Sequence, residues 1–254
     1  MIIQIIGLPG SGKTALAKRL ADRINAIHLN GDETRATVNK DLGFSIESRM
    51  EQARRLGELA RLISKQGHHV VVDFVCPTKL TRNSFGTPDM LVFMDTIESG
   101  RFKDTNDMFE RPEYADIRFN THDMDPDQKA KYIIATRKDL HDWYEPTTLM
   151  LGRYQPWHEG HHALYDEAGK RTDQVMVGVR STHKTSPKDP LSFDQVKVFI
   201  DQDEHMQSAM VVKMPNITNI VYGRDVGYKV EQVKLEDAIE NISATEIRKS
   251  MGLE

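Results

Sequence analysis

A glycine-rich octapeptide near the N-terminus constrains the fold of this chain more than any other feature. Residues 7–14 read GLPGSGKT and follow the short apolar run 2–6, which is rich in β-branched residues and predicts a buried strand. Residues 13–24 carry apolar side chains at helical spacing, so a helix is expected directly after the glycines. A strand, a glycine turn and a helix in this order gather backbone N–H groups around an anion. The segment therefore predicts a phosphate-binding loop at the edge of a parallel sheet.

The octapeptide matches the pattern G-x4-G-K-[ST] of a P-loop. In such a loop Lys13 places a positive charge at the β- and γ-phosphates of ATP, and the hydroxyl of Thr14 can ligate Mg²⁺. The residues expected to bind ATP here are Gly7, Pro9, Gly10, Ser11, Gly12, Lys13 and Thr14.

The hydrophobic pattern along the chain predicts two successive α/β units. In the first, strands are expected at 2–6, 70–72 and 90–94, and helices at 13–24, 46–66 and 127–141. Residues 96–127 are expected to be irregular, as a lid, a binding loop or a disordered stretch. In the second, strands are expected at 147–151, 174–179, 210–214 and 220–222, and helices at 160–169, 193–200 and 245–251. We therefore expect domains at residues 1–145 and 146–254, each an α/β fold with a parallel sheet.

Composition narrows the classes of partner. The formal net charge of −4 gives no basic surface of the kind that nucleic acid attracts, so we expect small-molecule substrates and no nucleic acid. Cys76 is the single cysteine, which excludes an intrachain disulfide and favours a reducing, cytoplasmic compartment. The N-terminal apolar run is too short to span a bilayer, so no membrane association is expected.

Three pieces of sequence after the P-loop resemble one kinase family. Residues 29–35 (LNGDETR), residues 39–45 (NKDLGFS) and Arg49 are similar to the adenylylsulfate kinase pattern D-G-D-x-x-R…N-x-D-L-G-F-S…R. The resemblance implies that Asp32 orients or deprotonates the acceptor hydroxyl, a role that suits an aspartate in phosphoryl transfer. It also implies a set of acceptor-binding residues: Arg35 and Arg49 for the phosphate, Phe44 for the base, and Asn39.

The first unit departs from this pattern at several positions. Asn30 stands where the family has an aspartate, Gln52 stands where it has an asparagine, and the basic lid of the family is not recognisable within residues 96–127. Asp73 closes an apolar strand and has two interpretations, a Mg²⁺ ligand or a solvated strand end. Arg54 and Arg55 belong either to the substrate site or to a solvated helix face.

A second motif, residues 152–161 (GRYQPWHEGH), follows the strand expected at 147–151 and opens a helix. His158 and His161 lie three positions apart near the helix N-terminus, where both can donate to one triphosphate. By itself such a pair is also compatible with two metal ligands or an ordinary surface pair. Residues 242–248 (ISATEIR) add a serine, a threonine and Arg248 at the start of the last helix. Read alone, Ser243 there is an ordinary N-cap and Arg248 a surface residue.

Together the two motifs resemble the G-x-F-x-P-x-H-x-G-H and I-S-x-T-x-I-R signatures of nucleotidyltransferases. This resemblance implies a Rossmann-like domain in which His158, His161 and Arg248 are catalytic. The ATP-binding residues that it implies are Gly152, Arg153, Tyr154, His158, His161, Arg224 within the segment Gly223-Arg224-Asp225, Ser243, Thr245 and Arg248.

The sequence as a whole predicts a bifunctional transferase. The first domain is expected to phosphorylate a small-molecule hydroxyl with ATP, and the second to transfer an adenylyl group to a phosphate monoester, both with Mg²⁺. Cytidylyl transfer and a nucleotide-sensing regulator with an inactive kinase domain stay open as alternatives. Both resemblances imply a homo-oligomer.

Overall fold

The chain divides into two compact units, Met1–Trp143 and Tyr144–Glu254, and each is described by itself. The structure is a computed structural model that describes residues 1–206, 209–224, 227, 229–240 and 242–253. Among these residues no helix combines the length and the apolar character needed to cross a bilayer. The assignment of a kinase to residues 1–145 and a nucleotidyltransferase to residues 146–254 stays a prediction.

The first unit, all of whose residues are described, is built on a parallel sheet with the strand order β2-β3-β1-β4-β5. Its strands are β1 (Ile2–Gly7), β2 (Ile27–Asn30), β3 (Val70–Asp73), β4 (Met90–Met94) and β5 (Ile117–Phe119). The central strand β1 is buried along its whole length, which explains its unbroken apolar run. The prediction of an α/β unit with a parallel sheet is confirmed.

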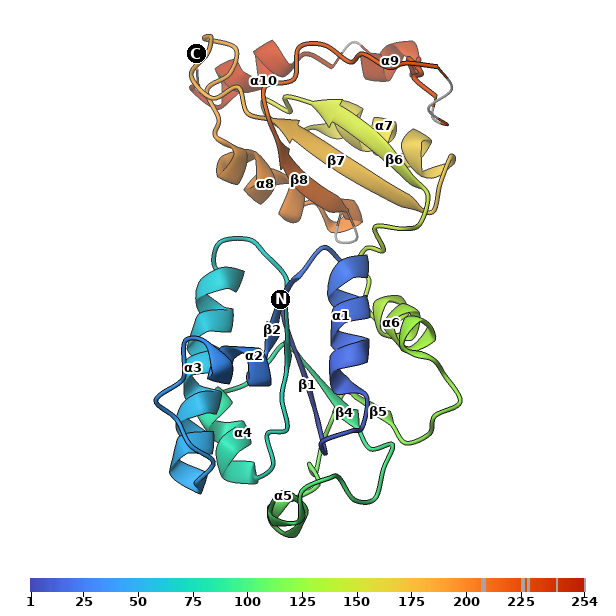
Figure 1. The fold of residues 1–254 in the computed structure, drawn as a ribbon. Helices are drawn as coiled ribbons and strands as arrows, with labels where there is room; N and C mark the ends of the chain where they lie inside the picture. The colour runs from blue at the N-terminus through green and yellow to red at the C-terminus, as the bar shows by residue number, and fades with distance from the viewer. Residues whose placement is uncertain (207–208, 225–226, 228, 241, 254) are drawn as a thin grey trace. The chain divides into compact units, whose positions relative to one another are not determined.

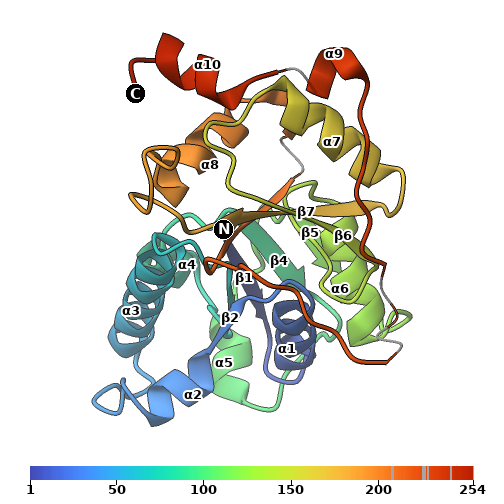
Figure 2. The ribbon, with the colours of Figure 1, turned by 90° about the horizontal axis from the view of Figure 1, so that it is seen from above.

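Helices cover both faces of this sheet (Figure 1). They are α1 (Lys13–Arg23), α2 (Gly31–Ala36), α3 (Ile46–Ser64), α4 (Lys79–Phe85), α5 (Lys103–Met108) and α6 (Pro126–Ala135). On one face Ile3 and Ile5 pack with Leu16 of α1 and Ile133 of α6, and Figure 2 shows these two helices side by side. On the other face the sheet packs against α3 and α4.

Parallel pairing brings polar residues to one edge of the sheet. Asp73, the last residue of β3, pairs with Asn30 at the end of β2 and with Ile5 near the end of β1. Since β1 leads directly into the P-loop, the carboxyl ends of the three strands meet beside it. Ligands of open α/β sheets bind at this edge.

Two expectations for the first unit were wrong. Residues 96–127 were expected to be irregular but contain α5 and β5, an edge strand in which Ile117 and Phe119 are buried and Arg118 is exposed. The helix expected at 127–141 ends at Ala135; the next four residues are polar, and Leu140 joins the core from outside the helix.

The second unit holds three parallel strands in its described residues, in the order β6-β7-β8. Its elements are β6 (Thr147–Gly152), α7 (Glu159–Gly169), β7 (Gln174–Arg180), α8 (Phe193–Asp201), the 3₁₀ turn η1 (Glu204–Met206), β8 (Met210–Met214), α9 (Asp237–Glu240) and α10 (Ala244–Ser250). Val175 and Val177 of β7 pack with Ala168 of α7 and Val196 of α8 in one core. The strand expected at 220–222 is absent: these described residues are exposed and pair with no strand.

Gly57 allows α3 and α4 to approach closely, and its substitution should destabilise the first unit. A Cβ atom at this position would lie 2.1 Å from the carbonyl oxygen of Phe85. We expect Gly57→Ala to lower the free energy of unfolding by about 1–3 kcal/mol, since the helices must move apart. Guanidinium denaturation followed by circular dichroism measures this change.

Gly43→Ala is the matched control, because its Cβ would meet only Ser48 Oγ at 3.9 Å. Equal stability of the two variants would contradict this account of α3–α4 packing.

Candidate active sites

The P-loop has the backbone of a phosphate cradle. Gly10 and Gly12 have φ values of 97° and 89°, a left-handed region in which other residues are strained. Gly12 is also the N-cap of α1, so the loop ends at the positive end of the helix dipole. Lys13 Nζ donates to the carbonyl oxygen of Leu8 at 2.9 Å, which holds the ammonium group across the loop.

Neighbouring segments fix the loop in place. A Cβ atom on Gly7 would lie 2.4 Å from the carbonyl oxygen of Met94, so β4 can lie beside the loop only because of the glycine. The Thr96 hydroxyl donates to the carbonyl oxygen of Ser11 at 2.9 Å. The Ser11 hydroxyl itself is buried without a partner among the described residues, as expected where a ligand supplies the missing hydrogen bond.

Asp73 is 1% exposed and lies at the centre of a hydrogen-bond network. The Thr14 hydroxyl donates to Asp73 Oδ2 at 2.6 Å, and Nε2 of His28 lies 2.6 Å from Oδ1. Burial by itself raises the pKa of Asp73, but hydrogen bonds from His28, Thr14 and Asn30 outweigh it and hold the pKa below its ordinary value. Asp73 is therefore an ionised, buried carboxylate and not a solvated strand end.

Asn30, which departs from the family pattern, has two functions in this network. Its amide Nδ2 donates to both oxygens of Asp73 at 3.1 Å, and its Oδ1 accepts the backbone N–H groups of Asp32 and Glu33 at 2.9 Å. The side chain thus caps α2 and places Asp32 next to the P-loop. An aspartate here would set a second carboxylate against Asp73, whereas the amide donates to it. Neither His28 nor Asn30 was predicted from the sequence to be a site residue.

A cavity of about 810 Å³ joins the P-loop to the predicted acceptor residues. Its walls contain the P-loop at one side, Asp32 at the start of α2, and two arginines of α2 and α3. The predicted site residues that line it are Pro9, Gly10, Gly12, Lys13, Thr14, Asp32, Arg35, Phe44, Arg49 and Asp73. Gly7, Ser11 and Asn39 are not among the lining residues.

Arg35 and Arg49 both lie close to the Phe44 ring. Their guanidinium carbons lie 4.8 Å and 5.6 Å from its centroid, close enough for cation–π attraction. Burial and the neighbouring Arg49 lower the pKa of Arg35. Phe44 is 65% exposed, so its ring is open to a stacking partner. Two cations and an open aromatic face suit an anionic ligand with a planar group.

Helix α5 and the two residues before it form one wall of the cavity, within the segment that was expected to be an irregular lid. Arg101, Phe102, Asp104 and Thr105 line the cavity. Arg49 Nη2 donates to Thr105 Oγ1 at 3.2 Å and lies 3.5 Å from the Asp104 carboxylate. The lid segment therefore contacts the predicted acceptor site directly.

Asn39 does not line the cavity but contacts a residue that does. Its amide donates to Gln52 Oε1 at 2.9 Å, and Gln52, which lines the cavity, donates to the carbonyl oxygen of Gly31. Direct substrate binding by Asn39 does not fit this position, since its side chain is 4% exposed. Arg54 and Arg55 form ion pairs with Glu51 on the helix surface, in agreement with the surface interpretation.

In the second unit His158 and His161 lie together at the start of α7. Nδ1 of His158 accepts the backbone N–H of Gly160 at 3.1 Å, and the two imidazole centroids are 3.8 Å apart. Burial, reinforced by the neighbouring His158, lowers the pKa of His161 to about 3. Nδ1 of His161 is buried without a partner among the described residues, as expected for a ring that completes its hydrogen bonds with a ligand.

Tyr154 packs in the hydrophobic core of the second unit and does not line an open nucleotide site. It is 3% exposed, and its hydroxyl donates to the carbonyl oxygen of Met150 at 3.0 Å. A Cβ atom on Gly152 would lie 2.6 Å from the tyrosine ring, so this glycine makes room for Tyr154. Gly160 likewise makes room for His158, 3.0 Å from such a Cβ. The packing of Tyr154 and His158 thus accounts for glycine at positions 152 and 160, and no nucleotide is needed to explain it.

Arg248 brings the two motifs of the second unit together. The guanidinium is 3% exposed and donates to the carbonyl oxygen of Gln155 at 2.8 Å and to Thr245 Oγ1 at 3.0 Å. Arg248 is therefore not a surface residue. Ser243 is the N-cap of α10 and accepts the backbone N–H of Glu246 at 3.4 Å.

The remaining predicted residues lie elsewhere. Arg153 donates to Asp189 at 3.2 Å, a buried carboxylate that the sequence analysis missed. The amide of Gln155, also missed, exchanges two hydrogen bonds with the Leu191 backbone. Arg224 is exposed, and its neighbour Asp225 lies outside the described residues.

The P-loop, the parallel strand order and the acceptor cavity define the first unit as a P-loop kinase fold. Residues 1–117 match the family model described as adenylylsulphate kinase. The resemblance to adenylylsulphate kinases is thus confirmed for residues 1–117.

Known proteins with related sequences carry the same description. A probable adenylyl-sulfate kinase of Aeropyrum pernix is 40% identical over 88 residues, which are 33% of this chain and 48% of the relative. One of Pseudomonas aeruginosa is 28% identical over 197 residues, covering 66% of this chain and 91% of the relative. The chain thus spans about half the length of the first of these relatives. A solved APS kinase of Mycobacterium tuberculosis, in complex with AMPPNP and APS, is 29% identical, with a TM-score of 0.47 over 53% of this chain and 95% of that one.

Raising the pH is expected to weaken MgATP binding at the P-loop. Burial lowers the pKa of Lys13 to about 8 even though Asp73 and Asp32 oppose the shift. Lys13 loses its charge above this pH unless a phosphate is bound, so the dissociation constant should rise up to about tenfold per pH unit. Calorimetric titration of the parent protein with MgATP gives this constant. The Lys13→Ala variant, which should lose the binding, shows which part of the signal comes from the P-loop.

Lys18→Ala, on the exposed side of α1, should keep the dependence, and Lys13→Arg should flatten it. An affinity that stays constant above pH 8 in the parent protein would contradict the assignment.

Lowering the pH should destabilise the second unit through His161. The unfolded chain takes up a proton near pH 6.5, but folded His161 does so only near pH 3. The free energy of unfolding should therefore fall by up to about 1.4 kcal/mol per pH unit below pH 6.5. Denaturation midpoints across this range measure the slope. His161→Phe and His161→Gln should both reduce it, and a slope that is unchanged in both would refute the prediction.

Proposed function

We propose that the chain is a bifunctional transferase that acts on small phosphorylated molecules. The observation that carries the first activity is the single cavity lined by Lys13, Asp32 and the Arg35–Arg49 pair. A triphosphate cradle and two arginines on opposite parts of one cavity suit a donor nucleotide and an anionic acceptor. An acceptor of the adenylylsulfate type, with an anionic group and a planar base, fits Arg35, Arg49 and Phe44.

The proposed first reaction is transfer of the γ-phosphoryl group of ATP to a hydroxyl. The hydroxyl oxygen attacks the γ-phosphorus, ADP leaves, and Asp32 accepts the hydroxyl proton. Lys13 and the backbone N–H groups of the P-loop hold the β- and γ-phosphates and stabilise the charge that develops there.

Thr14 and Asp73 suit Mg²⁺, because a hydroxyl and an ionised carboxylate 2.6 Å apart are the hard oxygen donors that this cation prefers. When bound, Mg²⁺ neutralises phosphate charge. His28 and Asn30 keep the Asp73 carboxylate oriented toward Thr14.

The proposed second reaction is adenylyl transfer from ATP to a phosphate monoester. Its support is the hydrogen bond from Arg248 to the Gln155 carbonyl, which joins the C-terminal motif to the loop carrying His158 and His161. A phosphate oxygen of the acceptor attacks the α-phosphorus and pyrophosphate leaves. The imidazoles donate to the phosphates as charge builds up. The parallel strands β6–β8, with α7 and α8 packed on β7, support a Rossmann-like domain for this reaction.

Two substitutions should separate the activities. Lys13→Ala should lower ADP formation at least about 100-fold and leave pyrophosphate release unchanged, because it removes one charged phosphate donor. His161→Ala should do the reverse. The assay follows ADP with adenylylsulfate as acceptor, and pyrophosphate with ATP or CTP and a panel of phosphate monoesters.

Lys18→Ala should leave both rates unchanged, and circular dichroism checks the fold of each variant. Loss of both activities in either folded variant would rule out two independent sites. Nucleotide binding without turnover in any assay would favour a nucleotide-sensing regulator, and release with CTP alone would make the second unit a cytidylyltransferase.

A further inference from the structure

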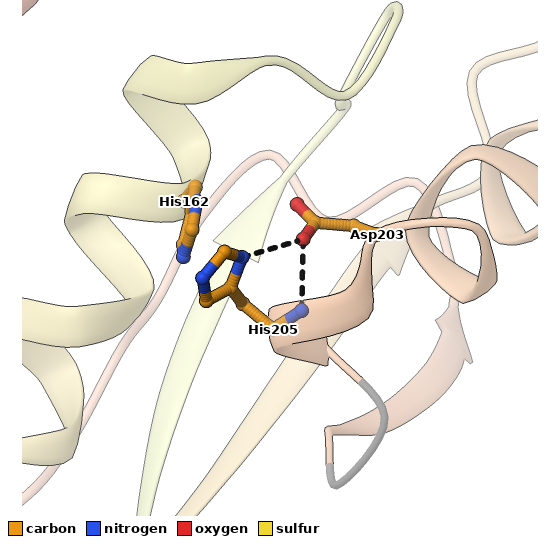
Figure 3. A group of neighbouring side chains, drawn as sticks. All are labelled: His162, Asp203 and His205. Atoms are coloured by element: carbon orange, nitrogen blue, oxygen red, sulfur yellow. Dashed lines mark hydrogen bonds and ion pairs between the residues drawn. The ribbon is translucent and has the colours of Figure 1, made fainter.

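Two histidines and an aspartate gather next to the histidine motif of the second unit. His162 belongs to α7 and directly follows His161, while Asp203 and His205 flank the start of η1 (Figure 3). Each offers one ligand atom, and these atoms all lie within 4.8 Å of one another. A metal site at His158 and His161 was an open alternative from the sequence, but those two rings contact each other and His161 also packs against Tyr154.

We propose that His162, Asp203 and His205 bind a divalent transition metal ion, with zinc as the best fit. Two imidazoles and one carboxylate are borderline donors that suit Zn²⁺, whereas Mg²⁺ and Ca²⁺ prefer oxygen ligands alone. Three protein ligands leave one coordination position for water.

The distances within the cluster agree with tetrahedral binding. His205 Nδ1 lies 3.4 Å from Asp203 Oδ1. Two ligands at about 2.1 Å from one ion, separated by this distance, subtend roughly 108° at the metal, close to the tetrahedral angle. The imidazole centroids of His162 and His205 lie 4.4 Å apart, and Figure 3 shows the two rings next to each other.

The carboxylate ligand is oriented by a second residue. Trp157 Nε1 donates to Asp203 Oδ2 at 3.1 Å, which leaves Oδ1 facing the histidines. Oδ1 accepts the backbone N–H of His205 at 3.1 Å and has a further lone pair for a metal. Asp166 lies 3.8 Å from Nε2 of His162 and can orient that ring. Such partners of the ligands are usual in metal sites.

The site is accessible from solvent and connected to the histidine motif. The His205 side chain is 72% exposed, whereas those of His162 and Asp203 are 20% exposed. A bound ion would fasten η1 to α7 and, through Asp203, hold Trp157, whose ring lies 5.4 Å from that of His161. The proposal concerns metal binding alone and does not depend on either transferase activity.

The test uses the full chain without an affinity tag, stripped with a chelator and titrated with Co²⁺ and then with Zn²⁺. We expect one equivalent of Co²⁺ to give the visible absorption of a tetrahedral complex, and Zn²⁺ to displace it. His162→Ala and His205→Ala should remove this signal, and Trp157→Phe should weaken binding by about 10–100-fold. Zinc should also raise the melting temperature of the parent protein but not of His205→Ala.

His68→Ala, which removes an exposed histidine of the first unit, is the matched control and should bind as the parent does. Circular dichroism shows whether each variant is folded, and the exposed position of His205 makes His205→Ala the decisive one. Absence of stoichiometric Co²⁺ binding, or binding that survives both His162→Ala and His205→Ala, would overturn the proposal. Equal loss in His68→Ala would assign the metal to scattered surface histidines and overturn it as well.

Discussion

A carboxylate stays ionised inside a protein only if several hydrogen-bond donors surround it. Because Asp73 is such a carboxylate, the first unit must place donors around it. Its three hydrogen-bond partners come from two elements: Thr14 from the start of α1, and His28 and Asn30 from β2. The buried charge of Asp73 therefore links the register of β2 and β3 to the position of the P-loop. Asn30 extends the link to α2, since the same amide group that contacts Asp73 also caps the helix that carries Asp32.

Much of the first unit could be predicted from the sequence because its signals are local. The apolar run of β1 and the glycines of the loop fix a strand, a left-handed turn and a helix within a short stretch. The acceptor residues Arg35, Phe44 and Arg49 were found by their similarity to a family pattern. Their convergence on the cavity with Lys13 follows from parallel pairing, which brings the carboxyl ends of the strands to one edge.

What the sequence did not predict depends on tertiary contacts. Helix α5 has six residues and no side-chain cap, so it depends on contacts such as those of Thr105 with Arg49 and of Asn106 with Gly100. His28 lies on a short, half-exposed strand, and nothing in its spacing relates it to Asp73. The position of Tyr154 in the motif predicted a contact with ATP. Its ring packs inward instead, because Gly152 leaves room for it. The strand expected at 220–222 has apolar residues but no strand beside it.

The hydrogen bond from Arg248 to Gln155 joins residues 93 positions apart. During synthesis at about 5–20 residues per second, the histidine loop is made roughly 5 to 20 s before the arginine that holds its backbone. The P-loop and its partner Asp73 are separated by a shorter stretch of 59 positions between Thr14 and the carboxylate. The phosphate cradle of the first unit can therefore assemble while the chain is still growing, whereas the second motif pair is completed only when translation has reached the last helix.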